Sequence, residues 1–354
     1  MASILAIRFS ALGDVVMTIP VLCSFAKRYP QHDITLLSRS GVAPLFKSGL
    51  PENVHFRSVD LNEYKGLKGL TRLYNELRSE GYDAVADLHD VLRTIYLRLL
   101  FSRQGFPVAY IHKGRREKLR LVSQKKRYRR PLTPSVDRYA LTLAELGYPF
   151  EVNSVSLFPK QGADIRDLTL TTGEKGSDCW IGVAPFAQHE GKIYPLDMMR
   201  RVVGMFDNET GVKIFLFGAG IKERTWCEKL QDDSRHVISM VGRYDIGKEL
   251  TLMNRLDVML TMDSANMHLA SLAGTPVVAV WGATHPFAGF AGMQQGGSVN
   301  LQADLDCRPC SIFGNKKCVR KVKYECMHLL TPQLLFKTVM RVAQRKYEEV
   351  QVPL

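Results

Sequence analysis

Residues 258–281 read VMLTMDSANMHLASLAGTPVVAVW, and this stretch decides the fold class. Two short apolar runs flank a polar turn and a segment that ends at Gly274. Apolar runs of this length are typical of strands buried on both faces, and a glycine commonly ends a helix. The stretch therefore predicts strand 257–261, helix 264–273 and strand 276–281, which together form a βαβ unit with parallel strands.

The same alternation runs through the rest of the chain in two series. The first opens with strand 3–9 and a helical spacing over 15–29, where Pro20 predicts a kink or a late helix start. The second opens with strand 180–184. The pattern favours an α/β fold with two doubly wound domains, joined near 150–175 and facing a cleft that binds ligands. Further strands are expected at 33–37, 53–58, 82–87, 107–111 and 213–217, and further helices at 64–79, 90–100, 136–146, 196–207, from 222 and at 332–350.

Composition narrows the function class. The chain has 354 residues, 45% hydrophobic and 23% charged, as in ordinary globular proteins. Its net charge of +13 predicts an acidic partner: nucleic acid, an anionic membrane surface or a phosphorylated substrate. Residues 113–130 (KGRREKLRLVSQKKRYRR) are strongly basic, although a solvated surface also explains them. Their only aromatic residue is Tyr128, which disfavours nucleic acid because bases need rings to stack on.

Targeting signals are lacking in the sequence. No stretch approaches the ~18 apolar residues that a membrane span needs, and the N-terminus does not resemble a signal peptide. We therefore expect a cytoplasmic protein whose seven cysteines are mostly reduced.

Asp14 is the first candidate for chemistry. It lies in RFSALGDVV, where the first expected strand gives way to a helix. The carboxyl ends of strands line the ligand crevice of open parallel sheets, and Gly13 permits close approach. A carboxylate at this place can act as a general base, or it can simply cap the helix.

The turn after strand 257–261 is the second candidate. Asp263, Ser264 and Asn266 cluster where that strand feeds a helix. A helix start offers free N–H groups and a positive dipole end to an anion, and small Ser264 and Ala265 allow a diphosphate to approach. His268 follows one turn later. A plain capped helix is the competing interpretation.

Other motifs are weaker. Lys192, in the loop APFAQHEGK (184–192), can place a charge on a phosphate, and Gly218 belongs to a glycine turn that does not form GxGxxG. No Walker A or HExxH sequence is present. Asp304-Leu305-Asp306 is a formal DxD pair. The spacing C-x2-C-x7-C-x7-C allows a structural zinc ion, disulfides or reduced packing thiols at Cys307, Cys310, Cys318 and Cys326.

Taken together, RFSALGDVVMTIP (8–20) and TMDSANMHLASLAGTPVVAVWGATHP (261–286) resemble glycosyltransferase family 9, the lipopolysaccharide heptosyltransferases. YDAVADLHDVLRT (82–94), the Lys192 loop and the cysteine-containing tail are looser similarities. The resemblance implies the GT-B architecture, with two Rossmann-like domains. The acceptor would bind domain 1–165 and the nucleotide sugar domain 175–330, followed by a C-terminal helix, 331–354. It also implies inverting chemistry without a metal or cofactor.

The resemblance assigns roles to residues. Asp14 matches the proposed base, and Lys192 the phosphate-binding lysine. The motif's usual Gly-Pro is Ala265-Asn266 here. No acid stands near Gly220 to read the donor ribose, so Glu223 is the substitute. The implied donor-binding residues are Asp263, Ser264, Ala265, Asn266, His268, Gly218 and Glu223, and the implied acceptor-binding residues are Gly13, Arg93, Arg115, Arg116, Lys118 and Arg120.

The expected function is the transfer of a sugar onto an anionic, lipid-linked lipopolysaccharide inner-core acceptor, and the donor that the resemblance implies is ADP-heptose. The basic surface would then meet the inner leaflet of the membrane. Another nucleotide sugar, a nucleotide-sugar epimerase of the same fold and a non-catalytic lipid A-binding protein are the alternatives. Neither the acceptor sugar nor the oligomeric state is encoded in a readable pattern.

Overall fold

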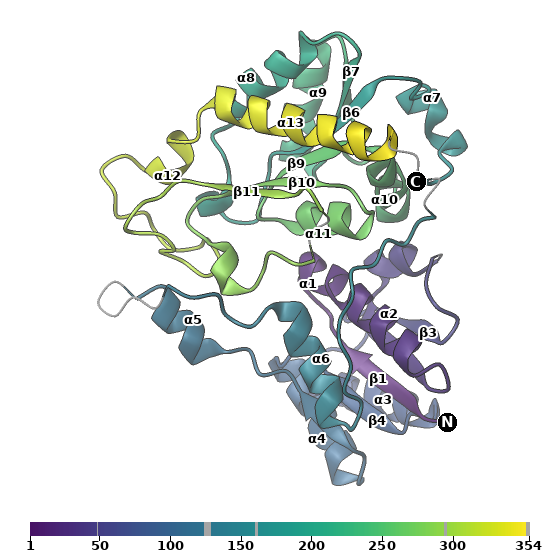
Figure 1. Ribbon diagram of the computed structural model, residues 1–354. Coiled ribbons are helices and arrows are strands. Elements are labelled where there is room, and N and C mark those ends of the chain that lie inside the picture. Colours follow the sequence, from purple (N-terminus) through teal and green to yellow (C-terminus); the bar gives the residue numbers. More distant parts are fainter. Residues whose placement is uncertain (48, 124–128, 160–161, 294–295, 352–354) are drawn as a thin grey trace. The chain divides into compact units, whose positions relative to one another are not determined.

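The computed structural model describes residues 1–47, 49–123, 129–159, 162–293 and 296–351 (Figure 1). The chain forms two compact units. Unit 1 comprises Met1–Gly114 and Thr133–Leu157, and unit 2 comprises Arg115–Leu132 and Phe158–Leu354. Within the described residues, no helix has the length and apolar character to cross a membrane.

Unit 1 is built on a parallel sheet with the strand order β3-β2-β1-β4-β5. The central strand, β1 (Ser3–Ile7), is fully buried from Ile4 onward. Successive side chains of a strand point to opposite faces. Leu5 and Ile7 pack with α3 (Gly66–Ser79) and α4 (Leu92–Arg103), and helices α2 (Thr18–Arg28) and α6 (Ser135–Glu145) pack together on the other face. The remaining elements are α1 (Leu12–Val16), β2 (Asp33–Arg39), η1 (Ser40–Phe46), β3 (Val54–Val59), β4 (Ala84–Asp87) and β5 (Val108–Tyr110).

Unit 2 contains a six-stranded parallel sheet in the order β11-β10-β9-β6-β7-β8. Its inner strands are continuous apolar runs because helices cover both faces. Helices α8 (Leu196–Asp207) and α13 (Pro332–Gln351) pack together on one face, and α10 (Ile246–Arg255) and α11 (Ala265–Leu272) on the other. The remaining elements are α5 (Arg115–Leu121), η2 (Arg166–Leu168), α7 (Thr169–Thr172), β6 (Cys179–Ala184), η3 (Glu190–Lys192), β7 (Val212–Leu216), α9 (Ile221–Asp232), β8 (Val237–Ser239), β9 (Val258–Met262), β10 (Val277–Trp281), η4 (Pro286–Ala288), β11 (Val299–Gln302) and α12 (Glu325–His328).

The expected strands and helices are present, with ends shifted by a few residues. The predicted helix over 15–29 is interrupted ahead of Pro20: α1 ends at Val16 and α2 begins at Thr18, so Pro20 lies in the first turn of α2, where its missing N–H costs nothing. The short elements β8, β11 and α5 and the helix α10 were not predicted, because their apolar residues are few or interrupted by charges.

Three stretches depart from the predicted domain boundaries. Residues 158–159 and 162–165, expected at the end of the N-terminal domain, already belong to unit 2. Residues 115–132 were expected in the N-terminal domain but belong to unit 2, because Leu121 and Leu132 pack against Ala288 and Ile312. The Leu132 N–H also donates to the Phe287 carbonyl oxygen at 2.9 Å. The C-terminal helix is not a separate segment, since Leu335, Val339 and their neighbours on α13 are buried in the core of unit 2.

Candidate active site

In unit 1, Asp14 lies at the carboxyl end of the central strand. It is the third residue of α1, and its Oδ2 accepts a hydrogen bond from the Ala11 N–H at 3.3 Å. The same oxygen lies 2.5 Å from Nη2 of Arg8, whose side chain is 8% exposed against 26% for Asp14. Arg8 also donates from Nη1 to the Leu88 carbonyl oxygen at 2.6 Å. Asp14 therefore caps its helix locally and, in addition, is held by a buried cation.

The end of the neighbouring strand completes this cluster. Ile7 of β1 pairs with Asp87 of β4, so the two carboxyl ends meet. Asp87 is fully buried, accepts the N–H groups of His89 and Asp90 at 2.9 and 2.8 Å, and receives Arg98 at 3.0 Å. The turn after β4 is thereby locked in place beside Asp14.

Two further rings lie close to the Arg8–Asp14 pair. His89 Nε2 is 3.4 Å from the Ser10 hydroxyl, and burial, followed by the Arg8 and Lys113 charges, lowers the His89 pKa to about 3. The ring is therefore neutral at pH 7. Tyr139 of α6 is buried, and both burial and the Asp14 charge raise its pKa, so its hydroxyl stays protonated. The surroundings of Asp14 thus combine the Arg8 cation with the neutral polar rings of His89 and Tyr139.

In unit 2, Lys192 and Asp263 form an ion pair. Lys192 Nζ lies 2.9 Å from Asp263 Oδ2, and the side chains are 15% and 4% exposed. Lys192 ends the short η3 helix in the loop after β6, and Asp263 directly follows β9, the neighbouring strand. The pair therefore forms where these two carboxyl ends meet, which the separate positions in the sequence do not reveal.

The loop that carries Lys192 packs against two other segments, the turn after β10 and the cysteine-containing tail. The Ala283 N–H donates to the Gly191 carbonyl oxygen at 2.8 Å. A Cβ on Gly191 would lie 2.7 Å from the Gly314 carbonyl oxygen, and one on Gly314 would lie 2.7 Å from Lys192 Cγ. Only glycines allow this approach, so the turn at Gly314 fixes the stem of Lys192.

Arg308 stabilises the segment around the end of β10, which contacts the Lys192 loop. Its guanidinium is buried and donates to the carbonyl oxygens of Trp281 and Thr284, both at 3.0 Å, and of Gly282 at 2.5 Å. These carbonyls belong to the last residue of β10 and to the segment after it, in which Ala283 donates to the Gly191 carbonyl oxygen. Neither Arg8 nor Arg308 was predicted as a site residue from the sequence. For Arg8 a signal existed, because it is a charged residue directly after the apolar run of β1.

The start of α11 lies beside the ion pair. Ser264 precedes the helix, and its hydroxyl contacts Thr261 Oγ1 at 3.2 Å instead of capping it. The first N–H groups of a helix have no partner within the helix, and Ala265 and Asn266 are half-buried there. His268 is 8% exposed, and Gly292 approaches its ring so closely that a Cβ would lie 2.6 Å from Nδ1.

Glu223 has a local task. Its Oε2 accepts the Ala219 N–H at 2.7 Å, and a Cβ on Gly218 would lie 2.8 Å from the same oxygen. Burial raises the Glu223 pKa, while the Ala219 N–H opposes that shift. The carboxylate closes the glycine turn after β7, next to β6 in the sheet.

The predicted donor residues thus all belong to unit 2, after the carboxyl ends of β7 and β9, and Lys192 lies in the loop after β6. The predicted acceptor residues are divided between the two units. Gly13 and the exposed Arg93 belong to unit 1, whereas α5, which carries the other four, belongs to unit 2 because its apolar face packs there. Those four are Arg115, Arg116, Lys118 and Arg120.

Residues 70–317 match the model of glycosyltransferase family 9 (heptosyltransferase). The chain belongs to this family. It is similar to lipopolysaccharide core heptosyltransferase OpsX of Haemophilus influenzae, with 22% identity over 287 residues, 80% of this chain and 80% of the relative.

Solved structures show the same fold. The family 9 glycosyl transferase from Veillonella parvula has a TM-score of 0.73 at 20% identity, covering 97% of this chain and 98% of that one. The E. coli ADP-heptose lipopolysaccharide heptosyltransferase II has a TM-score of 0.72 at 18% identity, covering 98% and 100%. The predicted GT-B fold is confirmed, and this enzyme is a glycosyltransferase of the lipopolysaccharide heptosyltransferase family.

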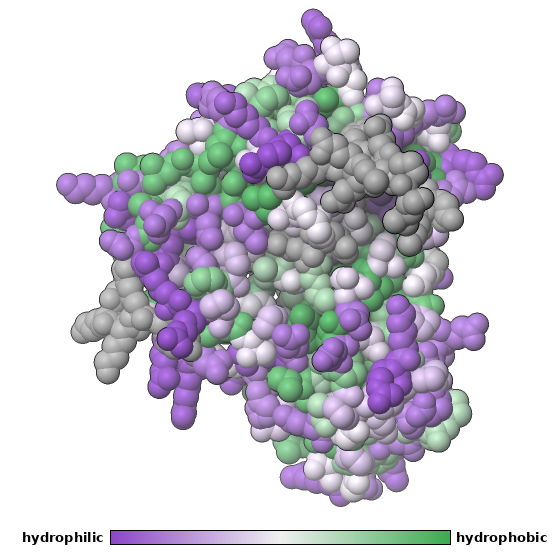
Figure 2. Space-filling model, viewed as in Figure 1, coloured by the Kyte–Doolittle hydropathy of each residue, from purple (hydrophilic) through white to green (hydrophobic). Residues whose placement is uncertain are grey.

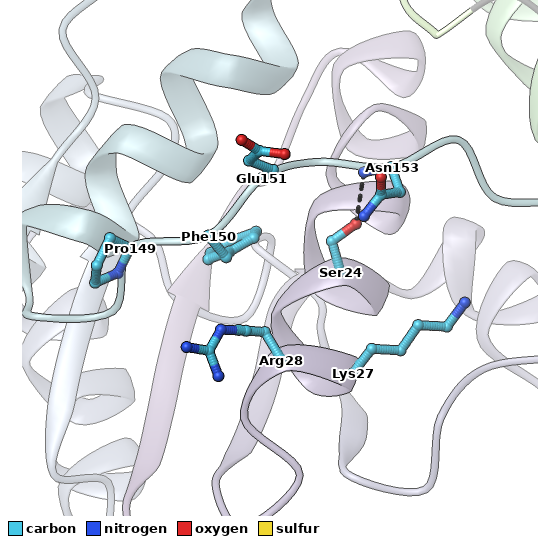
Figure 3. Close-up of a pocket in the computed structure, with 7 residues that line it drawn as sticks. All are labelled: Ser24, Lys27, Arg28, Pro149, Phe150, Glu151 and Asn153. Carbon is cyan, nitrogen blue, oxygen red and sulfur yellow. Dashed lines mark hydrogen bonds between the residues drawn. The ribbon is translucent and has the colours of Figure 1, made fainter.

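The glycosyltransferase also has a surface groove of about 680 Å³ on unit 1 (Figure 3). It forms where the segment after α6 crosses α2, and the Asn153 N–H donates to Ser24 Oγ at 3.0 Å. Lys27 and Arg28 extend from α2 in opposite directions. Because α2 ends just before β2 begins, the groove lies near the amino ends of the strands, away from Asp14. None of the predicted site residues lines it.

The cysteines of the glycosyltransferase are free thiols, so the disulfide alternative is wrong for this structure. Burial raises the pKa of Cys326 to about 11 and also raises that of Cys310. In the described parts of the chain, no three His, Cys, Asp or Glu side chains are grouped to hold a metal ion, which leaves the zinc alternative without support. Asp306 of the DxD pair is exposed and lies 3.5 Å from Arg129.

Proposed function

We propose that this glycosyltransferase transfers a heptosyl group from ADP-heptose to an anionic, lipid-linked inner-core acceptor of lipopolysaccharide, with inversion at the anomeric carbon. The observation that carries the proposal is the buried Lys192–Asp263 ion pair beside the start of α11. The name of the E. coli relative, an ADP-heptose lipopolysaccharide heptosyltransferase, supplies the donor.

The donor diphosphate would bind in unit 2. Lys192 offers a cation held in one place by Asp263, and the N–H groups at the start of α11 offer hydrogen-bond donors with a positive dipole end. The small side chains of Ser264 and Ala265 let a phosphate approach the backbone. This arrangement favours a ligand with two linked negative charges over a neutral sugar.

The chemistry would be a direct displacement. Asp14 takes the proton from an acceptor hydroxyl while that oxygen attacks the anomeric carbon, and the bond from this carbon to the diphosphate oxygen breaks. The charge that develops on the leaving diphosphate is stabilised by Lys192 and the start of α11. Arg8 orients the Asp14 carboxylate, since it holds Oδ2 at 2.5 Å. Attack from the face opposite the leaving group inverts the anomeric centre.

The Glu223 geometry leaves one alternative open within the same enzyme class. Glu223 accepts the Ala219 N–H in the turn after β7, and a contact from its carboxylate to the donor ribose would not tell ADP from UDP or GDP, which carry the same ribose. A donor with another nucleotide is the second candidate. The proposed reaction takes place in the cytoplasm at the inner leaflet, where lipid-linked acceptors reside.

Calorimetry with ADP, UDP and GDP tests the donor, and a transfer assay with ADP-heptose tests the reaction. We expect ADP to bind most tightly and the product to carry the opposite anomeric configuration by NMR. A preference for UDP or GDP would mean that the donor is another nucleotide sugar and not ADP-heptose. Release of an epimer without acceptor would replace transfer by epimerisation.

A further inference from the structure

Residues 313–323 (FGNKKCVRKVK), here named the basic loop, form an unusual surface segment of unit 2 just before α12. The basic loop contains five Lys or Arg and no acidic residue. Three apolar side chains lie among these charges and face solvent: Phe313 is 52% exposed, Val319 82% and Val322 53%. Apolar side chains of this size are normally covered when they occur together, so the composition points to a binding surface.

Two cations of the basic loop form ion pairs that hold its C-terminal end in place, and within the described structure three other lysines of the loop do not. The Arg320 guanidinium lies 2.6 Å from Glu325, and Lys323 pairs with Glu190. The Tyr324 N–H donates to Cys318 Sγ at 3.2 Å. No carboxylate of the described chain forms an ion pair with three further exposed lysines: Lys316, Lys317 and Lys321. The loop thus presents uncompensated cations on an ordered support.

Helix α5 extends this surface. The rings of Phe313 and Phe290 lie 5.8 Å apart, and Lys118 Nζ lies 4.4 Å from the centre of the Phe290 ring. α5 exposes Leu119 at 67% together with Arg115, Arg116 and Arg120. Figure 2 shows hydrophilic residues prevailing over α5 and the segment before α12, with a few apolar residues among them. The basic loop and α5 therefore join through Phe290 into one basic and apolar surface.

We infer that the basic loop docks this enzyme on the anionic face of a phospholipid bilayer, with Val319 and Val322 in the headgroup layer and the lysines on the lipid phosphates. Cations around exposed apolar side chains match such an interface, because the charges attract anionic headgroups and the apolar groups leave water. Nucleic acid fits less well, since Phe313 is the only aromatic residue in the basic loop on which a base could stack. The inference rests on the proposed function in one respect: docking would bring the enzyme to the lipid-linked acceptor that we propose.

Vesicle co-sedimentation of the full chain tests the inference without any sugar. Vesicles of phosphatidylcholine alone are compared with vesicles containing phosphatidylglycerol. Lys316→Gln, Lys317→Gln and Lys321→Gln together should weaken binding to the anionic vesicles roughly 100-fold, since one cation contributes about fivefold. Val319→Asp with Val322→Asp should weaken it at least tenfold. The control triple variant is Lys47→Gln, Lys65→Gln and Lys68→Gln, which removes the same charge from exposed positions of unit 1 and should change binding little.

Three results would overturn the inference. These are wild-type binding that is equal for neutral and anionic vesicles, an equal loss in the control triple variant, and tighter binding to a single-stranded oligonucleotide at the same salt. Calorimetry with ADP separates this inference from the proposed function. Loop variants that bind ADP normally but not vesicles support docking, and vesicle binding by an enzyme that transfers no sugar leaves docking intact and removes the proposed reaction.

Discussion

Each unit holds an ion pair at the carboxyl edge of its parallel sheet next to a predicted site residue, and the Arg8–Asp14 pair of unit 1 has the opposite polarity to the Lys192–Asp263 pair of unit 2. In unit 1 the buried partner is the cation: Arg8 is 8% exposed and Asp14 26%. In unit 2 the buried partner is the anion: Asp263 is 4% exposed and Lys192 15%. The more exposed partner is therefore a carboxylate in the unit 1 pair and an ammonium group in the unit 2 pair.

This difference teaches how one fold can serve two tasks. A buried charge needs a partner, and that partner is held in a defined place by the same attraction. A held carboxylate suits the removal of a proton, whereas a held ammonium suits the binding of phosphate. Substituting one member of each ion pair at a time distinguishes an effect on proton removal from an effect on phosphate binding.

Asp14→Asn should have the largest effect. If Asp14 is the base, turnover should fall roughly 10²- to 10⁴-fold, while the affinity for ADP, which we propose to bind in unit 2, stays the same. Transfer rates and calorimetry measure the two quantities. The control is Asp60→Asn, an exposed aspartate of a turn in unit 1. Near-normal turnover of Asp14→Asn would remove its assignment.

Lys192→Gln should weaken the binding of the donor diphosphate. Loss of one charged contact is worth about 1.5–3 kcal/mol, so the affinity for ADP should fall roughly 10- to 100-fold by calorimetry. The variant leaves Asp263 buried without its cation, and the double variant Lys192→Gln with Asp263→Asn removes that complication. Lys229→Gln, at an exposed position of α9, is the control. Unchanged affinity in the double variant would contradict a phosphate contact.

Arg8→Lys should have a smaller effect on turnover. Lysine keeps the charge but loses the fork that reaches both Asp14 and the Leu88 carbonyl oxygen. We expect turnover to fall roughly tenfold through misplacement of Asp14, with ADP affinity unchanged. In the Asp14→Asn background the same change should cost little further turnover, because the two residues act as one unit. Additive losses would show that Arg8 acts elsewhere.

The smallest expected effects concern pH, and they again differ in sign between the units. In unit 1, His89 has its pKa lowered to about 3, mainly by burial. Folding then favours the neutral ring, and this contribution to stability is lost as pH falls below 6.5 towards 3. In unit 2, burial and then the Asp245 charge raise the pKa of Glu249 to about 7. Folding favours the protonated carboxyl, and stability is lost as pH rises from 4.5 through 7.

Glu249→Gln tests the second half of this contrast. The variant lacks the titration, so its Tm should exceed that of the wild type by roughly 2–4 °C at pH 8.5, about 1 kcal/mol, and match it near pH 4.5. Thermal melts at the two pH values measure this. The neighbouring surface change Lys248→Gln serves as the control. An equal shift at both pH values would point to packing instead of ionisation.

Much of the fold follows from local patterns. The apolar runs of β6, β9 and β10 and the stop at Gly274 predict a parallel sheet directly, because strands buried on both faces must be continuously apolar. Elements with weak patterns escaped: β8 has only three residues, and α5 is mostly charged. The assignment of 115–132 to unit 2 was missed because it depends on where Leu121 and Leu132 pack.

The sequence by itself determined the alternation of strands and helices, the family, and the positions of Asp14, Lys192 and Asp263 at the ends of strands. These properties are local, since a residue that follows a parallel strand arrives at the ligand edge of the sheet whatever the rest of the chain does. Only the tertiary structure decided which buried charge holds each of them, that the turn at Gly314 supports Lys192, and that α5 and the basic loop share one surface. The reason is that strand order brings β6 beside β9, and no short-range pattern in the chain encodes which strands become neighbours.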